Sequence, residues 1–390
     1  MEEDDLSTHL AQFLDGLVAA HYHRASLMCV GSGSSVVSAD SHVLEPPDLW
    51  TSRMPRRWRP VAPRMVTSPE RGLVLVGLGM GAVTVNDASA PDTKLASHRV
   101  DFASMQKGGY DPDVRVADMD LDGVDAEILY PTVCLLLYTA PDADYRRACV
   151  RVYNDWLAEF CSARPERLYG VALLDVEDPG WAVEEMRRAK EAGMVGCMVP
   201  GRPPDGDYHE TRFDPLWEAA SASQLPVSVH AFTDRTRKPS GPSMFMDPIH
   251  QIQRTLVLLA QSGVFTRHPR LRVVVSEFDA GWVPHFFERF DSIVERRGDD
   301  EAGRPSDVLR RHVHFGFQVD RVAVALREWI GTETLLWGSD YPHVSSFWPR
   351  SLEVLDELLA GVPDADRAAI TGGNAVGLYG LTVANVAAAR

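Results

Sequence analysis

Acidic and imidazole side chains stand at the carboxyl ends of several short apolar runs in this sequence. The residues in question are Asp40, His42, His230, Glu277, Asp340 and His343. Burying a carboxylate or an imidazole costs free energy unless a partner neutralises it or forms a hydrogen bond with it. Each of these residues therefore implies a partner, and one cation can serve several of them at once.

Two imidazoles combined with carboxylates are a donor set typical of zinc or manganese sites. In the Asp-x-His sequence at residues 40–42, the two side chains project to the same face of a strand, because residues i and i+2 align. Taken singly, a histidine at a strand end is more often a hydrogen-bonded core residue, Asp340 can cap a turn, and Glu277 can be half of an ion pair. The repetition at separate strand ends favours a metal site instead. The residues that could share such a site are Asp40, His42, His230, Glu277, Asp279, Asp340 and His343.

Eight runs rich in apolar and β-branched residues alternate with longer amphipathic stretches. The runs cover residues 36–42, 125–131, 168–175, 194–200, 226–232, 272–279, 313–318 and 334–343. Between them, apolar residues recur three and four apart, which is the helical period. This alternation indicates a parallel sheet covered on both faces. Eight strands predict an α/β fold of the (β/α)8 TIM-barrel type, with its active site at the carboxyl ends of the strands. An open doubly wound sheet is the alternative, but no G-x-G-x-x-G follows the first strand.

The predicted organisation is one barrel with an additional segment at each end. Residues 1–34 form an N-terminal extension with a helical stripe, residues 35–383 form the barrel, and residues 384–390 form a tail. Two connections are longer than usual. Residues 46–115 follow the first strand and include a hairpin candidate, GLVLVGLGMGAVTV, and residues 233–246 follow the fifth strand and resemble a flap. Long loops in a compact domain are usually functional or disordered.

The composition indicates a globular protein of the cytoplasm. The formal net charge of -16 argues against nucleic acid or an anionic membrane as a partner, since both need a basic surface. No run approaches the roughly 18 apolar residues of a membrane span, and the acidic start MEEDD is unlike a signal peptide. Five scattered cysteines without C-x-x-C spacing are typical of a reducing compartment.

These motifs together resemble a known family. The Asp-x-His-x-x-Glu-Pro-Pro sequence from residue 40, His230, GWVPHFFERFD, WGSDYPH around Asp340 and the closing GGNAVGLYG are similar to the amidohydrolase-2 branch of the amidohydrolase superfamily. The resemblance covers about residues 36–381. It implies a (β/α)8 barrel, a homodimer and one divalent metal ion, with zinc expected first and manganese, iron or cobalt as alternatives.

Carried over to this sequence, the resemblance makes Asp40 and His42 first-strand ligands and His230 the fifth-strand ligand. Asp340 becomes the eighth-strand aspartate, which binds the metal and handles protons. One departure stands out. Decarboxylases of this branch usually carry a catalytic histidine in a G-H-x-G stretch after the sixth strand, where this sequence reads Ser-Glu-Phe-Asp. Glu277, in that place, is expected to be a ligand or a proton carrier.

The missing imidazole favours hydrolysis of a C–N amide or related bond in a small-molecule or peptide substrate. A divalent ion lowers the pKa of its bound water from about 15.7 towards 7, and Asp340 would take the proton released. The predicted catalytic residues are Asp340, His230 and Glu277, and the predicted substrate-binding residues are His343, Glu45 and Arg235. The alternatives are non-oxidative decarboxylation of an aromatic or unsaturated carboxylic acid, and a non-catalytic barrel used for binding.

Overall fold

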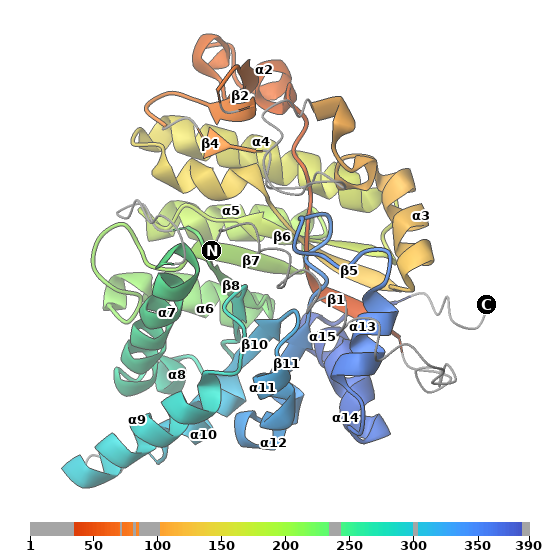
Figure 1. Cartoon of the computed structure of the whole chain (residues 1–390). Coiled ribbons are helices and arrows are strands. Elements are labelled where there is room, and N and C mark those ends of the chain that lie inside the picture. Colours follow the sequence, from red (N-terminus) through yellow and green to blue (C-terminus); the bar gives the residue numbers. More distant parts are fainter. Residues whose placement is uncertain are drawn as a thin grey trace, which may run out of the picture. The chain divides into compact units, whose positions relative to one another are not determined.

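All eight predicted strands are present and form one parallel sheet in the computed structural model (Figure 1). The structure describes residues 35–70, 72–80, 83–85, 102–233, 243–298 and 303–383. The predicted N-terminal extension and C-terminal tail lie outside these residues. In sheet order the strands are β1 (Val37–His42), β5 (Ala126–Tyr130), β6 (Leu168–Leu173), β7 (Gly196–Pro200), β8 (Val227–His230), β9 (Val273–Ser276), β10 (Val313–Phe317) and β11 (Leu335–Trp337).

The sheet closes between its first and last strands. Just beyond β11, the backbone N–H of Asp340 donates to the carbonyl of Asp40 (2.9 Å), and the N–H of His42 donates to the carbonyl of Tyr341 (2.7 Å). Gly338 permits this approach, because a Cβ there would lie 2.6 Å from the Cβ of Asp40. Closure makes the (β/α)8 barrel that the sequence predicts and excludes the open doubly wound sheet.

Helices link successive strands and cover the outside of the barrel (Figure 1). Asp111 and Asp178 begin two of them as N-caps, each accepting hydrogen bonds from two backbone N–H groups of the first turn and each followed by proline. The helices are α2 (Leu49–Arg53), α3 (Pro112–Asp122), α4 (Ala143–Ser162), α5 (Pro179–Glu191), α6 (Asp214–Ser223), α7 (Ser243–Gln261), α8 (Val264–Arg267), α9 (Val283–Arg297), α10 (Pro305–His312), α11 (Arg321–Ala325), α12 (Arg327–Ile330), α13 (Ser351–Leu358), α14 (Asp364–Ala368) and α15 (Asn374–Tyr379). Within the described ranges, no helix has the length and apolar character needed to cross a lipid bilayer.

Short helical turns complete the connections. They are the 3-10 segments η1 (Arg59–Val61), η3 (Phe102–Ser104), η4 (Lys107–Gly109), η5 (Val133–Thr139), η6 (Thr211–Phe213) and η8 (Thr332–Thr334), and the π-helical segment η9 (Ala369–Gly373). The closing GGNAVGLYG stretch holds the last strand in place, because Asn374 donates to the carbonyls of Thr332 and Leu335, both at 2.8 Å. That part of the motif therefore has a structural role.

The long connection after β1 contains a small antiparallel sheet of β2 (Arg64–Ser68), β3 (Gly72–Val76) and β4 (Val83–Thr84). The predicted hairpin is thus confirmed, and β2 adds a third strand to it. Tyr145 of α4 ties this connection to the barrel, since its hydroxyl donates to the carbonyl of Val61 (2.9 Å).

The predicted flap after β8 is shorter than the sequence indicates. Residues 243–246 belong to the first turn of α7 rather than to a loop. Residues 234–242, which include Arg235, lie outside the described part of the chain, so its predicted contact with substrate stays a prediction.

Candidate metal centre

Strand register aligns the polar residues at one end of the barrel. His42, the last residue of β1, pairs with Tyr130, the last residue of β5. His230, the last residue of β8, pairs with Ser276, which directly precedes Glu277. Because all strands of a parallel barrel point the same way, their carboxyl ends share one mouth.

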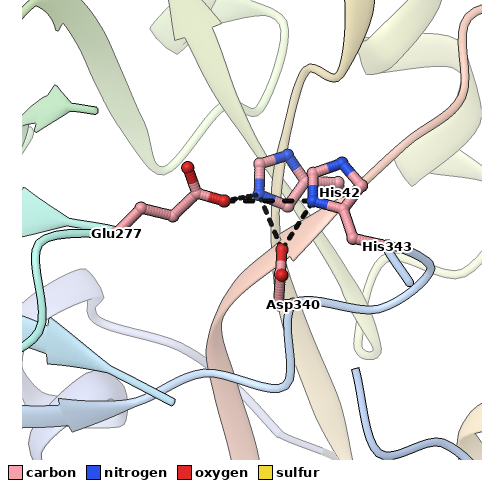
Figure 2. A group of neighbouring side chains, drawn as sticks. All are labelled: His42, Glu277, Asp340 and His343. Atoms are coloured by element: carbon pink, nitrogen blue, oxygen red, sulfur yellow. Dashed lines mark hydrogen bonds and ion pairs between the residues drawn. The ribbon is translucent and has the colours of Figure 1, made fainter. Parts of the chain in front are cut away.

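The side chains meet around the imidazole of His42. Figure 2 shows Glu277, Asp340 and His343 approaching this ring from the ends of β9 and β11. Nε2 of His42 lies 3.4 Å from Oδ1 of Asp40, 3.3 Å from Oε1 of Glu277 and 3.4 Å from Oδ1 of Asp340. Two ligands that each lie about 2.1 Å from a tetrahedral zinc ion are about 3.4 Å apart. The spacing of these donors is therefore that of a metal coordination shell.

His230 completes the group on the side of Asp40. Its Nε2 lies 3.9 Å from Oδ1 of Asp40, and its Nδ1 lies 3.6 Å from Oε2 of Glu277. The four predicted ligands thus come together as expected, and Glu277 joins them. The donor atoms form two overlapping sets, one of Asp40, His42 and His230, the other of His42, Glu277, Asp340 and His343.

Three buried atoms in this cluster lack a hydrogen-bond partner among the described residues. They are Oδ1 of Asp40, Nε2 of His42 and Nε2 of His230. Nδ1 of His42 donates to the carbonyl of Pro131 (2.8 Å), and Nδ1 of His230 donates to the carbonyl of Ala231 (3.0 Å). A carbonyl only accepts, so Nδ1 carries a hydrogen, and in the neutral ring Nε2 has the lone pair that can bind a cation. Since buried polar atoms without a partner are rare, these residues are suited to one divalent cation.

The electrostatics of the cluster favour added positive charge. Burial alone lowers the pKa of His42, but the carboxylates of Asp40 and Glu277 outweigh burial and hold that pKa well above its ordinary value. The same balance raises the pKa of His230. Burial raises the pKa of Asp40, yet the neighbouring imidazoles of His230 and His42 bring it well below its usual range. A bound cation would supply the charge that protons otherwise bring.

Asp340 is held on both sides by its own loop. Its Oδ1 accepts a hydrogen bond from Nδ1 of His343 (2.7 Å), and its Oδ2 accepts one from the hydroxyl of Ser345. The ring of His343 stacks on that of His42, with 4.0 Å between ring centroids. His343, predicted to touch substrate, therefore lies against the metal cluster itself.

The backbone is strained where these residues leave their strands. Glu277 (φ 63°) and Asp340 (φ 59°) have left-handed conformations, as do Phe232 after β8 and Asp279 after β9. Non-glycine residues seldom adopt positive φ, and such strain gathers at functional sites because the surrounding structure must enforce it. At Glu277 and Asp340, this backbone conformation occurs where the two carboxylates approach the end of the barrel.

A buried ion pair, which no motif in the sequence indicates, supports the segments that carry the cluster. Nε of Arg115 lies 2.5 Å from Oε2 of Glu127, and both side chains are almost fully buried. Arg115 also donates to the carbonyls of His42 (2.7 Å) and Tyr341 (3.3 Å). The pair therefore locks the end of β1 to the segment after β11. The run of residues 125–131 begins with Asp125 and carries a second acid, Glu127, in its apolar interior, and this was the available signal.

Glu45 has a different position from the one its predicted substrate contact requires. Its side chain is fully buried, and its two oxygens accept hydrogen bonds from the backbone N–H groups of Val133 and Cys134, both at 3.0 Å. Burial raises the pKa of this carboxyl group, although the two N–H groups oppose that effect. Glu45 thus anchors the loop after β5.

Replacing Glu45 by alanine should lower the free energy of unfolding by about 2–4 kcal/mol, because two buried N–H groups lose their acceptors. Urea denaturation measures the change. Glu159→Ala is the matched control: it removes an exposed glutamate paired with Arg53, and exposed pairs contribute about 0–1 kcal/mol. Equal losses in the two variants would contradict the anchoring role.

Comparison with known proteins confirms the (β/α)8 barrel and identifies the class of protein as a metal-dependent enzyme. A family model described as "Amidohydrolase" matches residues 42–381, so the chain belongs to the amidohydrolase family. Gamma-resorcylate decarboxylase from Rhizobium sp. (strain MTP-10005) is 28% identical over 286 residues, which cover 65% of this chain and 86% of that protein.

Solved structures show the same fold. An amidohydrolase from Mycobacterium avium subsp. paratuberculosis K-10 superposes with a TM-score of 0.72 at 21% identity, covering 90% of this chain and 98% of that one. A 5-carboxyvanillate decarboxylase from Novosphingobium aromaticivorans DSM 12444, solved with manganese, superposes with a TM-score of 0.65 at 19% identity, covering 90% and 97%.

The expectation of C–N bond hydrolysis is wrong by this comparison. Four curated relatives that match this chain are all named gamma-resorcylate decarboxylases. The absence of a histidine after the sixth strand is therefore a poor guide to the reaction. His343, in the loop after β11, brings an imidazole to within 3.9 Å of Glu277.

Proposed function

We propose that this protein catalyses the non-oxidative decarboxylation of an aromatic carboxylic acid, with one divalent metal ion as cofactor. Three buried donors, on Asp40, His42 and His230, have no hydrogen-bond partner within the described part of the chain. They carry this proposal, since they converge at the mouth of a barrel whose curated relatives are named decarboxylases. A buried acid and imidazole cluster of this kind has no role in a barrel used only for binding.

The metal would be held by these three residues together with Asp340 or Glu277. A set of two imidazoles and carboxylates suits zinc or manganese. Zinc is the ion expected from the sequence, whereas a structural neighbour was solved with manganese. When bound, the ion would hold and neutralise the carboxylate of the substrate beside a site rich in negative charge.

The reaction needs one proton at one carbon atom. When the bond between the ring and the carboxylate breaks, carbon dioxide leaves and the electron pair stays on the ring carbon, which must then take up a proton. Asp340 is the proposed donor, because it lies in the cluster and is paired with His343. Asp340 rests as a carboxylate, so it takes up a proton from solvent before passing it to the ring carbon, and each turnover consumes one proton.

Glu277 and His343 together replace the imidazole expected after β9. Glu277 supplies a carboxylate 3.3 Å from Nε2 of His42, where it can act as a ligand or steer the substrate. His343 supplies the imidazole from the loop after β11. Both kinds of group are therefore present at the mouth of the barrel, and the imidazole comes from the loop after β11.

Removing the metal should abolish carbon dioxide release. The purified protein is treated with a chelator, its metal content is measured by elemental analysis, and it is assayed with 2,6-dihydroxybenzoate, 5-carboxyvanillate and related hydroxybenzoates. We expect about one ion per chain, loss of activity with the ion, and recovery with added manganese or zinc. The thermal midpoint should also fall, because a ligand that binds only the folded state stabilises it.

His285→Ala is a suitable control in the same assay. His285 lies on α9 with an exposed side chain and belongs to neither set of donor atoms. This variant should keep the metal content and chelator response of the wild type. A protein purified without metal, and equally stable with and without chelator, would contradict the proposed function.

A further inference from the structure

Thr132 links the loop after β5 to the metal cluster through His343. Its Oγ1 lies 2.9 Å from Nε2 of His343, and Nδ1 of the same ring lies 2.7 Å from Oδ1 of Asp340. A carboxylate only accepts, so Nδ1 carries a hydrogen, whereas a hydroxyl can donate to Nε2 or accept from it. Thr132 therefore remains a partner for Nε2 whether the ring is neutral or charged.

Two carboxylates lie near Nδ1 of His343. Nδ1 of His343 lies 2.7 Å from Asp340 but also 3.9 Å from Oε1 of Glu277. Stacking on His42 restrains the plane of the ring, but a half-turn about the Cβ–Cγ bond preserves that plane and takes Nδ1 away from Asp340. The same half-turn takes Nε2 away from the Thr132 hydroxyl, so the hydrogen bond there opposes it. The hydroxyl thus helps to hold Nδ1 on Asp340.

The segment that carries Thr132 is itself held firmly. Glu45 accepts hydrogen bonds from the N–H groups of the two residues that follow, Val133 and Cys134. The preceding residue, Pro131, accepts a hydrogen bond from Nδ1 of His42. One short segment, residues 131–134, therefore orients both imidazoles, one through a carbonyl and the other through a hydroxyl. Functional groups are positioned best when their supports are rigid in this way.

We propose that Thr132 is a positioning residue of the reaction: its hydroxyl keeps the ring of His343 on Asp340 and away from Glu277. The effect of this hydrogen bond on kcat rests on the proposed function, since Asp340 is the proposed proton donor. Its effect on the orientation of His343 does not depend on any activity. The two effects are therefore measured separately.

The test compares Thr132→Val, which removes the hydroxyl at nearly constant volume, with Thr132→Ser, which keeps it. With an accepted hydroxybenzoate, Thr132→Val should lower kcat about 5- to 10-fold, the scale of one lost hydrogen bond, with KM changed less than about twofold. Thr132→Ser should keep the kcat of the wild type. Thr139→Val is the control, because that hydroxyl lies in the same loop but is exposed and donates to the carbonyl of Leu136 rather than to the cluster.

Nitrogen-15 NMR of histidine-labelled holoprotein provides the second readout. The Nδ1–H signal of His343, assigned by its loss in His343→Gln, should be slow to exchange in the wild type and in Thr132→Ser but not in Thr132→Val. The proposal is overturned if Thr132→Val leaves this signal unchanged, or if Thr132→Ser is impaired as much as Thr132→Val. Absence of decarboxylation in every variant, with the signal behaving as expected, would instead refute the proposed function.

Discussion

Asp340→Asn should lower kcat by about 10²-fold or more, the usual effect of losing a group that transfers a proton. The amide keeps an oxygen that can accept the hydrogen bond from His343, so the loop after β11 should keep its conformation. It cannot release a proton to the ring carbon of the substrate. Steady-state assay of carbon dioxide release, with metal content measured on the same sample, gives the result.

Ser345→Ala is the matched control for this substitution. It removes the other hydrogen bond to the Asp340 carboxylate but no proton carrier. We expect kcat within about tenfold of the wild type. Full turnover by Asp340→Asn with the metal in place would refute the role of Asp340 as proton donor, and loss of the metal would show that it acts mainly as a ligand.

Arg115→Met should lower the free energy of unfolding by about 3–5 kcal/mol, the range for breaking a buried ion pair. The substitution leaves the Glu127 carboxylate buried without its cation and removes donors from the carbonyls of His42 and Tyr341. Metal affinity should fall as well, because the end of β1 loses its support. Urea denaturation and metal titration measure the two effects.

The double variant Arg115→Met with Glu127→Leu should be more stable than Arg115→Met alone, since no uncompensated charge remains. Arg254→Met is the control: Arg254 pairs with Asp207 at the surface, with more than half of its side chain exposed, and should change stability by about 1 kcal/mol or less. If Arg115→Met were as mild as Arg254→Met, the ion pair would not support the cluster.

The strands and their polar ends were predictable because a parallel barrel leaves a strong pattern in the sequence. Strands buried on both faces read as continuous apolar runs, so Asp40, His42 and His230 stand out against them. All eight runs correspond to barrel strands. Strand direction alone predicts that the four ligands meet, because the carboxyl ends of all the strands lie at one mouth of the barrel.

Other features could not be read this way, because they depend on which atoms find partners across the fold. Glu45 belongs to the Asp-x-His-x-x-Glu motif, yet its carboxylate lies on backbone N–H groups that come 88 and 89 residues later. Arg115 lies in a helix with no motif of its own, although it pairs with Glu127 in β5. The predicted flap was too long because the start of α7 has little helical pattern of its own.

The sequence by itself determined the barrel, the end of it that carries chemistry and the types of donor found there, because these follow from hydrophobic period and strand direction. Only the tertiary structure decided which donors are left without partners, and that His343 stands beside Glu277. The physical reason is that a buried polar atom finds a hydrogen-bond partner only within a few ångströms, and the possible partners are remote in the chain. Strand order and register set those distances, and no local pattern encodes them.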